Sequence, residues 1–381
     1  MKKNILSILV ILIILISLTF IANFSCSQNG KNAQNENLSQ DVSLDDILQD
    51  DEKVMAQMAF DVTKCLPKGY VIDASVDYTD SIRKCLNKNK IVMMPSFPLL
   101  ISEKGLNVSS GARVFFQDGS SLIMKANSLS NYAVLLVSNA NDVVIYSPVI
   151  VGDRDKHLGT SGEWGMGISI KDSKNVYVKS PSISNCWGDG IYIGKTTGNS
   201  TNIEISDGKI DNCRRNGISI CDGRNVKIQN TIISNSNGTL PMCGIDIEPN
   251  DSIANIDSIK ISNVTTLNNS NGGILIALNY ILSKKEKKVG IEINNHIDDG
   301  SNYGFILYGF NSSSYPYATP LKGSIIVNSP VWKNNKIQPV GTGGVYKMSP
   351  QTIFNNIQII NSSKKIEDVK LLLSKINVSV N

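Results

Sequence analysis

Short runs in which β-branched and polar residues alternate recur along the middle of this 381-residue chain. Five of them read Gly-Ile-x-Ile or a near copy of it, and their glycines are Gly167, Gly190, Gly217, Gly244 and Gly273. Two further alternating runs follow within each repeat, so each repeat of 23 to 29 residues holds three predicted strands and no helix. Self-similarity at this period is typical of a solenoid. The pattern predicts an all-β chain, a parallel β-helix with three short strands per coil.

An asparagine followed by a small residue closes the third strand of four successive repeats, at Asn185, Asn212, Asn235 and Asn269. Coils that stack about 4.8 Å apart would place these side chains in one column, where amides can hydrogen-bond along the ladder. Cys186 and Cys213 come next in two of the repeats, and we expect them to be small buried residues of a neighbouring column. A disulfide between adjacent coils is the alternative.

Less repetitive segments flank the repeats and predict covers for the solenoid. Two helices are expected within a helical N-terminal cap, the second over Tyr78–Leu86, because the open end of a solenoid must be covered. A closing helix is expected over Ile366–Ile376. The predicted boundaries are residues 43–90 for the cap, 91–310 for the β-helix, and 311–381 for the terminal coils and C-terminal cap.

The first residues predict export. Residues 1–25 hold Lys2-Lys3 and a long apolar run, as in a secretory signal, and Ser25-Cys26-Ser27 resembles a lipoprotein cleavage site with Cys26 as the lipidated residue. An uncleaved membrane anchor is the alternative, since the run approaches spanning length. Residues 27–42, rich in Asn, Gln and Ser, predict a flexible tether. We expect a protein of the bacterial cell envelope, lipid-anchored or secreted, that meets the membrane only through this anchor.

Composition narrows the class of partner. Hydrophobic residues make up 41% of the chain and charged residues 18%, which suits one elongated domain with a continuous apolar interior. The formal charge of +4 is small, and the basic cluster at Lys284–Lys288 has no aromatic residues for base stacking beside it. We therefore expect no binding of nucleic acid. A monomer is expected. With only two histidines and no C-x-x-C pair, no zinc site is predicted.

The segments before the repeats carry a family resemblance. They are, in order, the helix at Tyr78–Leu86, Ile91–Pro95, a strand ending at Ile101, and Gly105–Val114. This order resembles the N-terminal region of the pectate lyase superfamily, the pectin-lyase-like right-handed β-helix proteins, and the repeats resemble that superfamily's β-helix. The resemblance covers about residues 75–310. It implies a right-handed parallel β-helix and a protein that binds, cleaves or epimerises acidic polysaccharides.

The resemblance also permits a test of one chemistry. Polygalacturonases place three active-site signatures before consecutive Gly-Ile-like strands, and these supply an Asp, a pair of Asp and a His. Aligned on the glycines, the first signature falls on Asp189 and agrees. The second falls on Arg215-Asn216 and the third on Met242-Cys243, which lack the required side chains. The usual polygalacturonase set is therefore not present.

Two long loops predict a groove at one corner of the solenoid. The loops Gly152–Met166 and Asn235–Gly244 enter equivalent corners with two tight coils between them, and would wall a groove about 14 Å wide. Indoles can lie on sugar rings and arginines can bind carboxylates. The alternative is a Trp-Trp-Arg stack that only shields the core. The residues expected to bind substrate are Arg154, His157, Glu163, Trp164, Trp187, Arg214 and Arg215.

Three carboxylates are the catalytic candidates. Asp246 and Glu248 lie two apart on one predicted strand, hence on one outward face about 6.6 Å apart, within the range for pairs that act on glycosidic bonds. Asp189 lies two coils away, and we expect it to join them only with help from loops, such as the one that carries Glu163. The alternative is an exposed acidic face that only keeps the solenoid soluble.

Two reaction schemes fit these residues. In hydrolysis, Asp246 and Glu248 would be acid and base. In a lyase or epimerase, Arg214, Arg215, His157 or bound Ca²⁺ would neutralise a uronate. No cofactor is required, and Ca²⁺ is the one candidate, through Asp153 and Asp155, which alternatively only pin their loop.

The sequence thus predicts an exported lyase or hydrolase that acts on an acidic glycan. A non-catalytic glycan-binding or adhesive surface protein remains the alternative.

Overall fold

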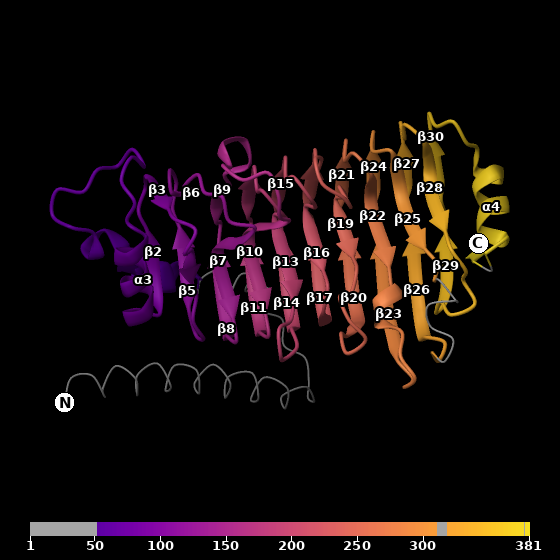
Figure 1. Ribbon diagram of the computed structural model, residues 1–381, viewed down its shortest axis with the longest axis horizontal. Helices are drawn as coiled ribbons and strands as arrows, with labels where there is room; N and C mark the ends of the chain where they lie inside the picture. Colours follow the sequence, from indigo (N-terminus) through magenta and orange to yellow (C-terminus); the bar gives the residue numbers. More distant parts are fainter. Residues whose placement is uncertain (1–51, 311–317, 377) are drawn as a thin grey trace, which may run out of the picture. The chain divides into compact units, whose positions relative to one another are not determined.

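Three parallel sheets wind along one axis in the computed structural model, which describes residues 52–310, 318–376 and 378–381 (Figure 1). Each strand pairs with the equivalent strand of the next coil, so the parallel β-helix predicted from the repeats is confirmed. The predicted signal at residues 1–25, the lipidation site Cys26, the tether at residues 27–42 and the predicted start of the first cap helix lie outside the described residues. Within the described ranges, no helix has the length and apolar character needed to cross a membrane.

The 12-stranded sheet consists of β1 (Phe60–Asp61), β2 (Ile91–Met94), β5 (Arg113–Phe116), β8 (Asn141–Tyr146), β11 (Lys174–Lys179), β14 (Thr201–Ser206), β17 (Gly223–Gln229), β20 (Ile256–Ser262), β23 (Lys288–Asn294), β26 (Lys322–Asn328), β29 (Gln351–Asn355) and β31 (Ser379–Val380). The 9-stranded sheet consists of β4 (Leu106–Asn107), β7 (Asn131–Ser138), β10 (Trp164–Lys171), β13 (Ile191–Gly194), β16 (Ile218–Ile220), β19 (Ile245–Ile247), β22 (Gly272–Ala277), β25 (Tyr303–Tyr308) and β28 (Gln338–Gly343). The 10-stranded sheet consists of β3 (Pro98–Ile101), β6 (Ser121–Met124), β9 (Val149–Val151), β12 (Ser182–Ser184), β15 (Lys209–Asp211), β18 (Ile232–Ser234), β21 (Thr265–Leu267), β24 (Ile297–Asp299), β27 (Val331–Lys333) and β30 (Gln358–Ile360). All three sheets run past residue 310, through the segment where terminal coils were predicted.

The core follows from the period of two in each strand. The isoleucines after the repeat glycines pair directly across β10, β13, β16, β19 and β22, and each is fully buried, namely Ile168, Ile191, Ile218, Ile245 and Ile274. Burying an isoleucine side chain contributes about 1.5–3 kcal/mol, and the inward column repeats that gain in every coil. A continuous apolar interior therefore holds the coils together.

Asparagines turn the chain at the predicted corner. Asn185, Asn212 and Asn235 have φ of 56°, 53° and 58°, a left-handed conformation that Asn adopts more readily than most residues. The Asn212 Nδ2 donates to the Asn185 Oδ1 at 2.6 Å, as the ladder prediction requires. Asn235 instead donates to the Asp211 Oδ1 at 2.7 Å. The asparagine ladder thus combines the backbone conformation with bonds between coils.

One corner prediction is wrong by a residue. Ser234 pairs with Leu267, so Asn268, with φ of 52°, and not Asn269, stands in the corner column. Asn269 is buried beside it, where its Oδ1 accepts from the Ser236 backbone N at 3.0 Å. Because Asn268 and Asn269 are adjacent in the sequence, the alignment of this repeat with the others was ambiguous by one position.

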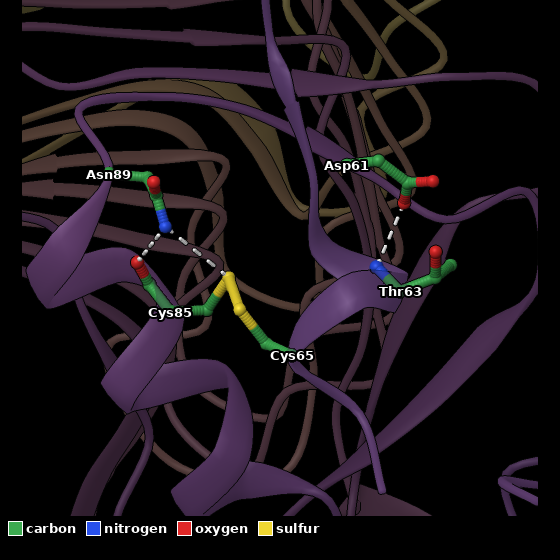
Figure 2. The surroundings of a disulfide bond; sticks show 5 residues. All are labelled: Asp61, Thr63, Cys65, Cys85 and Asn89. Carbon is green, nitrogen blue, oxygen red and sulfur yellow. Dashed lines mark hydrogen bonds between the residues drawn. A yellow bond between two sulfur atoms is a disulfide. The ribbon is translucent and has the colours of Figure 1, made fainter. Parts of the chain in front are cut away.

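The two ends carry the expected helices, α3 (Thr79–Lys88) and α4 (Ile366–Ser374). Short 3₁₀ turns are η1 (Val62–Cys65), η2 (Arg154–Lys156) and η3 (Asn279–Ile281). A disulfide between Cys65 and Cys85 joins η1 to α3, and Figure 2 shows Asn89 beside it, donating to the Cys85 carbonyl oxygen at 3.0 Å. The sequence did not predict this bond. Cys186 and Cys213 are free and buried, which confirms their prediction as small column residues and excludes the alternative disulfide.

A polar network is buried inside the later coils. The Asp298 carboxylate accepts from Thr266 Oγ1, Ser301 Oγ and Asn335 Nδ2, each at 2.7 Å. His296 lies beside it, with its Nε2 at 2.8 Å from Thr266 Oγ1. Burial raises the pKa of Asp298 to about 7 against the opposing effect of these hydrogen bonds, and burial lowers the pKa of His296 to about 3.

We predict that Asp298 makes folding less favourable as pH rises. The folded pKa lies above the unfolded value of about 3.9, so the stabilising contribution of the proton is present below that value and is lost as pH approaches 7. Relative to Asp298→Asn, the free energy of unfolding of the parent should fall by about 3 kcal/mol between pH 5 and pH 8. Urea denaturation of both proteins at both pH values measures this. His296 is common to both proteins, so its titration cancels, and parallel pH curves would contradict the prediction.

Candidate functional site

The candidate site lies on the outward face of the 9-stranded sheet. Asp189 and the pair Arg215-Asn216 precede β13 and β16, and Asp246 lies within β19, where it pairs with Ser219. Glu248 follows β19. As predicted, Asp246 and Glu248 are separated by one inward residue and so share the outward face.

Arg215 connects four carboxyl groups, and its side chain is only 11% exposed. Its Nη1 lies 3.1 Å from Asp189 Oδ2, its Nη2 lies 3.9 Å from Asp246 Oδ2, and its Nε lies 3.6 Å from Glu163 Oε2. The charge of Glu248 also acts on it. We call Asp189, Asp246, Glu248 and Glu163 the carboxylate cluster. Three carboxylates of the protein thus lie within ion-pair distance of Arg215, which already pairs it inside the protein, and its binding to a uronate stays a prediction.

Asn216 joins Asp189 to Asp246. Its backbone N donates to Asp189 Oδ1 at 3.1 Å, and its Nδ2 donates to Asp246 Oδ2 at 3.0 Å. The two aspartates are therefore coupled by the coil between them. This corrects the expectation that only loops would bring Asp189 to the other carboxylates.

Burial governs the protonation of the cluster. Burial raises the pKa of Asp189, while the charge of Arg215 opposes the shift. Burial raises the pKa of Asp246 well above its usual range, and the charge of Glu248 adds to it. The pKa of Glu248 is also raised, by burial and by the charge of Glu163, with Arg215 opposing. Asp246 is fully buried and Glu248 half-buried, so the alternative of an exposed solubilising face is wrong.

Among the described residues, Asp246 Oδ1 makes no hydrogen bond. Its other oxygen is held by Asn216. The buried Asp246 carboxyl therefore has one oxygen that no protein group engages, an exception to the pairing of buried polar groups that calls for an explanation.

The predicted sugar platform at Trp187 is wrong. The His157 ring stacks on the indole with centroids 3.9 Å apart, and the Arg214 guanidinium carbon lies 3.8 Å from the indole centroid, so both faces are covered. The shielding stack weighed as the alternative does form, but His157 replaces Trp164 in it. Trp164 is 48% exposed and remains available to a ligand. The His157 side chain is fully buried against Asp153 and Trp187, so it does not line an open groove.

The two loops predicted to be separate walls are tied together. Arg154 donates from Nη1 to Asn212 Oδ1 at 2.9 Å and from Nη2 to Asn237 Oδ1 at 2.6 Å, which links the first loop to the second. Arg214 Nη1 also donates to the Gly162 carbonyl oxygen at 2.8 Å. Arg154 therefore holds the corner together, and it does not face an open groove as predicted.

Asp153 pins its loop, as the structural alternative proposed. It is buried, and its carboxylate accepts from Tyr132 Oη at 2.5 Å and Asn127 Nδ2 at 3.0 Å, with His157 Nδ1 at 2.9 Å. Asp155 is exposed. Across the described ranges, no group of three or more His, Cys, Asp or Glu side chains could hold a metal ion.

Known proteins share this architecture. A family model described as "Right handed beta helix region" matches residues 101–254. Protein YclG of Bacillus subtilis (strain 168) is 30% identical over 227 residues, which cover 54% of this chain and 36% of that protein, so the chain spans about a third of this relative.

Two solved structures are similar in fold. The surface adhesin PfbA of Streptococcus pneumoniae is 13% identical with a TM-score of 0.54, covering 80% of this chain and 89% of that one. A polygalacturonase from Erwinia carotovora ssp. carotovora is 13% identical with a TM-score of 0.51, covering 83% and 98%. At these identities the likeness shows the fold alone.

We predict that Arg215→Met destabilises the protein by about 3–5 kcal/mol at pH 8, because it leaves Asp189 buried without its counter-charge. The loss should shrink at pH 5, where Asp189 can take up a proton, and should be partly reversed by adding Asp189→Asn. Urea denaturation measures each variant. Arg224→Met is the control, since the Arg224 side chain is 61% exposed and its removal should cost less than about 1 kcal/mol. Equal losses for the two arginines would contradict the prediction.

Proposed function

We propose, from the right-handed parallel β-helix fold that this chain shares with the pectin-lyase-like superfamily, that it binds a polysaccharide over the 9-stranded sheet and hydrolyses it at the carboxylate cluster. One observation carries the proposal: a buried carboxyl with a strongly raised pKa, Asp246, lies beside a second carboxyl, Glu248, that reaches the surface. Glycoside hydrolysis needs such a pair, one protonated and one ionised.

The roles follow from the order of the two pKa values. The charge of Glu248 raises the pKa of Asp246, so Glu248 ionises first and Asp246 retains its proton. Once binding of the glycan uncovers the buried Oδ1, Asp246 would donate that proton to the glycosidic oxygen, and Glu248 would take a proton from the attacking water. A strand spacing of about 6.6 Å between the two residues falls at the lower edge of the range for inversion.

The charged residues of the candidate site suit hydrolysis of a glycosidic bond better than elimination by a lyase. A lyase must neutralise the carboxylate of its uronate substrate before a base removes the adjacent proton. Arg215 is already shared by Asp189, Asp246 and Glu163, and Arg214 lies against Trp187. The carboxylate cluster would also repel a uronate next to Glu248. We therefore propose a neutral sugar at the reacting bond, in place of the acidic glycan expected from the sequence.

A second function is favoured by one specific observation. Asp246 is fully buried, and Arg154 ties the loops beside it. A non-catalytic glycan-binding surface protein needs no access to that carboxyl. In that case the half-exposed residues Glu163 and Trp164 would grip a ligand without cleaving it.

We also propose that the protein is exported, by lipid anchoring at Cys26 or by secretion. The disulfide between Cys65 and Cys85 supports an oxidising compartment, because such bonds persist outside the reducing cytosol. Labelling with a radioactive fatty acid, comparing the parent with Cys26→Ala, tests the anchor.

The two functions separate in one experiment. Purified protein is incubated with neutral mannan, polygalacturonate and alginate while reducing ends and the ultraviolet absorbance of unsaturated products are followed. We expect reducing ends without absorbance on the neutral polymer. Asp246→Asn and Glu248→Gln should each lower the rate at least about 100-fold and retain binding. Binding without turnover of any polymer would favour the adhesive alternative, and absorbance would identify a lyase.

We predict that Glu163→Gln moves the acid limb of the pH–rate profile to lower pH. Glu248 must be ionised to act as the base, and the charge of Glu163 raises its pKa. Removing that charge lets Glu248 ionise at lower pH, so activity should begin sooner as pH rises. Glu204→Gln, on the 12-stranded sheet beside Lys227, is the control and should leave the profile unchanged. An acid limb at the same pH in all three proteins would show that Glu248 is not the base.

A further inference from the structure

Two glycines lie in the last strand of the 9-stranded sheet, where a strand normally carries side chains. They are Gly341 and Gly343 of β28. A Cβ at Gly341 would lie 3.0 Å from Tyr303 Cδ1, and a Cβ at Gly343 would lie 3.5 Å from Tyr308 Cδ1. Glycine inside a strand weakens it and marks a close approach by another group. Here the approaching groups are the rings of two tyrosines from the preceding strand, β25.

Tyr308 keeps a large part of its surface open. Tyr308 is 41% exposed, while Tyr303 at the other end of β25 is half-buried and packs against the cluster of Cys243, Leu275, Ala277 and Ile306. A hydrophobic ring that rests on a glycine and faces solvent has an apolar face fixed in direction. Such a face matches the apolar face of a pyranose ring.

The platform lies in line with the carboxylate cluster. Ile247 pairs with Ile276, and Ala277 pairs with Tyr308, so Glu248, Ala277 and Tyr308 occupy one outward column. Two coil spacings, about 10 Å, separate Glu248 from Tyr308, and the small side chain of Ala277 lies between them. Burial raises the pKa of the Tyr308 hydroxyl, and the charges of Cys243, Tyr303 and then Glu248 add to that shift.

We infer that Tyr308 binds a sugar ring of the polysaccharide chain that occupies the carboxylate cluster, with its own ring supported by the backbone at Gly343, where only a small residue fits beneath it. The ligand is a glycan segment that runs along the solenoid axis, one unit stacked on Tyr308 and another beside Glu248. This inference rests on the proposed function, because it takes the occupant of the sheet to be a polysaccharide.

The test measures binding, independently of turnover. Native gels containing soluble mannan, polygalacturonate or alginate retard a protein that binds the polymer. Tyr308→Ala should weaken retardation about tenfold, judged from the polymer concentration that gives half the effect. Gly343→Val should weaken it similarly, because its methyl groups displace the ring, whereas Gly343→Ala adds only an ordinary contact and should bind as the parent does.

Two controls separate this inference from the proposed function. Tyr177→Ala removes a tyrosine of similar exposure, 36%, from the 12-stranded sheet, and it should leave binding unchanged. Glu248→Gln should bind and not cleave. If the parent binds and Tyr308→Ala binds equally well, the platform is wrong while the proposed function stands. If the parent binds none of the three polymers, both are overturned.

Discussion

The registry between coils is the constraint on which every other feature depends. Parallel pairing aligns each strand with its equivalent in the next coil, and left-handed asparagines hold the corner between sheets at the same point of each turn. Because that alignment is fixed, residues about 27 positions apart in sequence become direct neighbours. Arg215 and Asp189 meet for this reason, as do Asn216 and Asp246. A slip of one residue would exchange the inward and outward sets and bury the polar side chains.

The carboxylate cluster around Arg215 shows how aligned coils can bury several charged side chains together. A single guanidinium faces Asp189, Asp246 and Glu163, and Asn216 supplies two further donors to the aspartates. One cation cannot compensate so many ionised carboxylates in a desolvated place, and protonation of Asp246 relieves part of the excess. The residues that stabilise the cluster are thus the same ones that would set its reactivity.

The sequence predicted most of the fold because each coil corresponds to a recognisable repeat in the amino-acid sequence. The Gly-Ile-x-Ile runs, the cap at α3 and the closing helix α4 all lie where periodicity and helix signals placed them. The two misses have different causes. The corner was misplaced at Asn269 because Asn268 and Asn269 are adjacent in a repeat, and the bond between Cys65 and Cys85 was missed because it joins two segments of a cap that carries no repeat. The local amino-acid sequence does not specify which of two adjacent asparagines adopts the left-handed conformation at the corner. It also does not specify which cysteines of a cap form a disulfide.

The site was less predictable because long side chains reach beyond their own column. Alignment of the repeats on their glycines correctly placed Asp246 and Glu248 on one face of the sheet and Trp187 near Arg214. It could not show that His157 would fold back onto the indole or that Arg154 would cross to Asn237. Loop conformation decides those contacts, and loop residues obey no period.

The amide of Asn216 has a consequence for how this surface could change over time. Its nitrogen donates to Asp246 while its backbone holds Asp189, so the position tolerates two neighbouring carboxylates only because it is itself uncharged. Introducing an aspartate there, the first step toward a paired-aspartate arrangement, would add a third acidic group with no new cation to balance it. A route from this surface to that arrangement therefore has to begin elsewhere, with the loss of one of the existing acids.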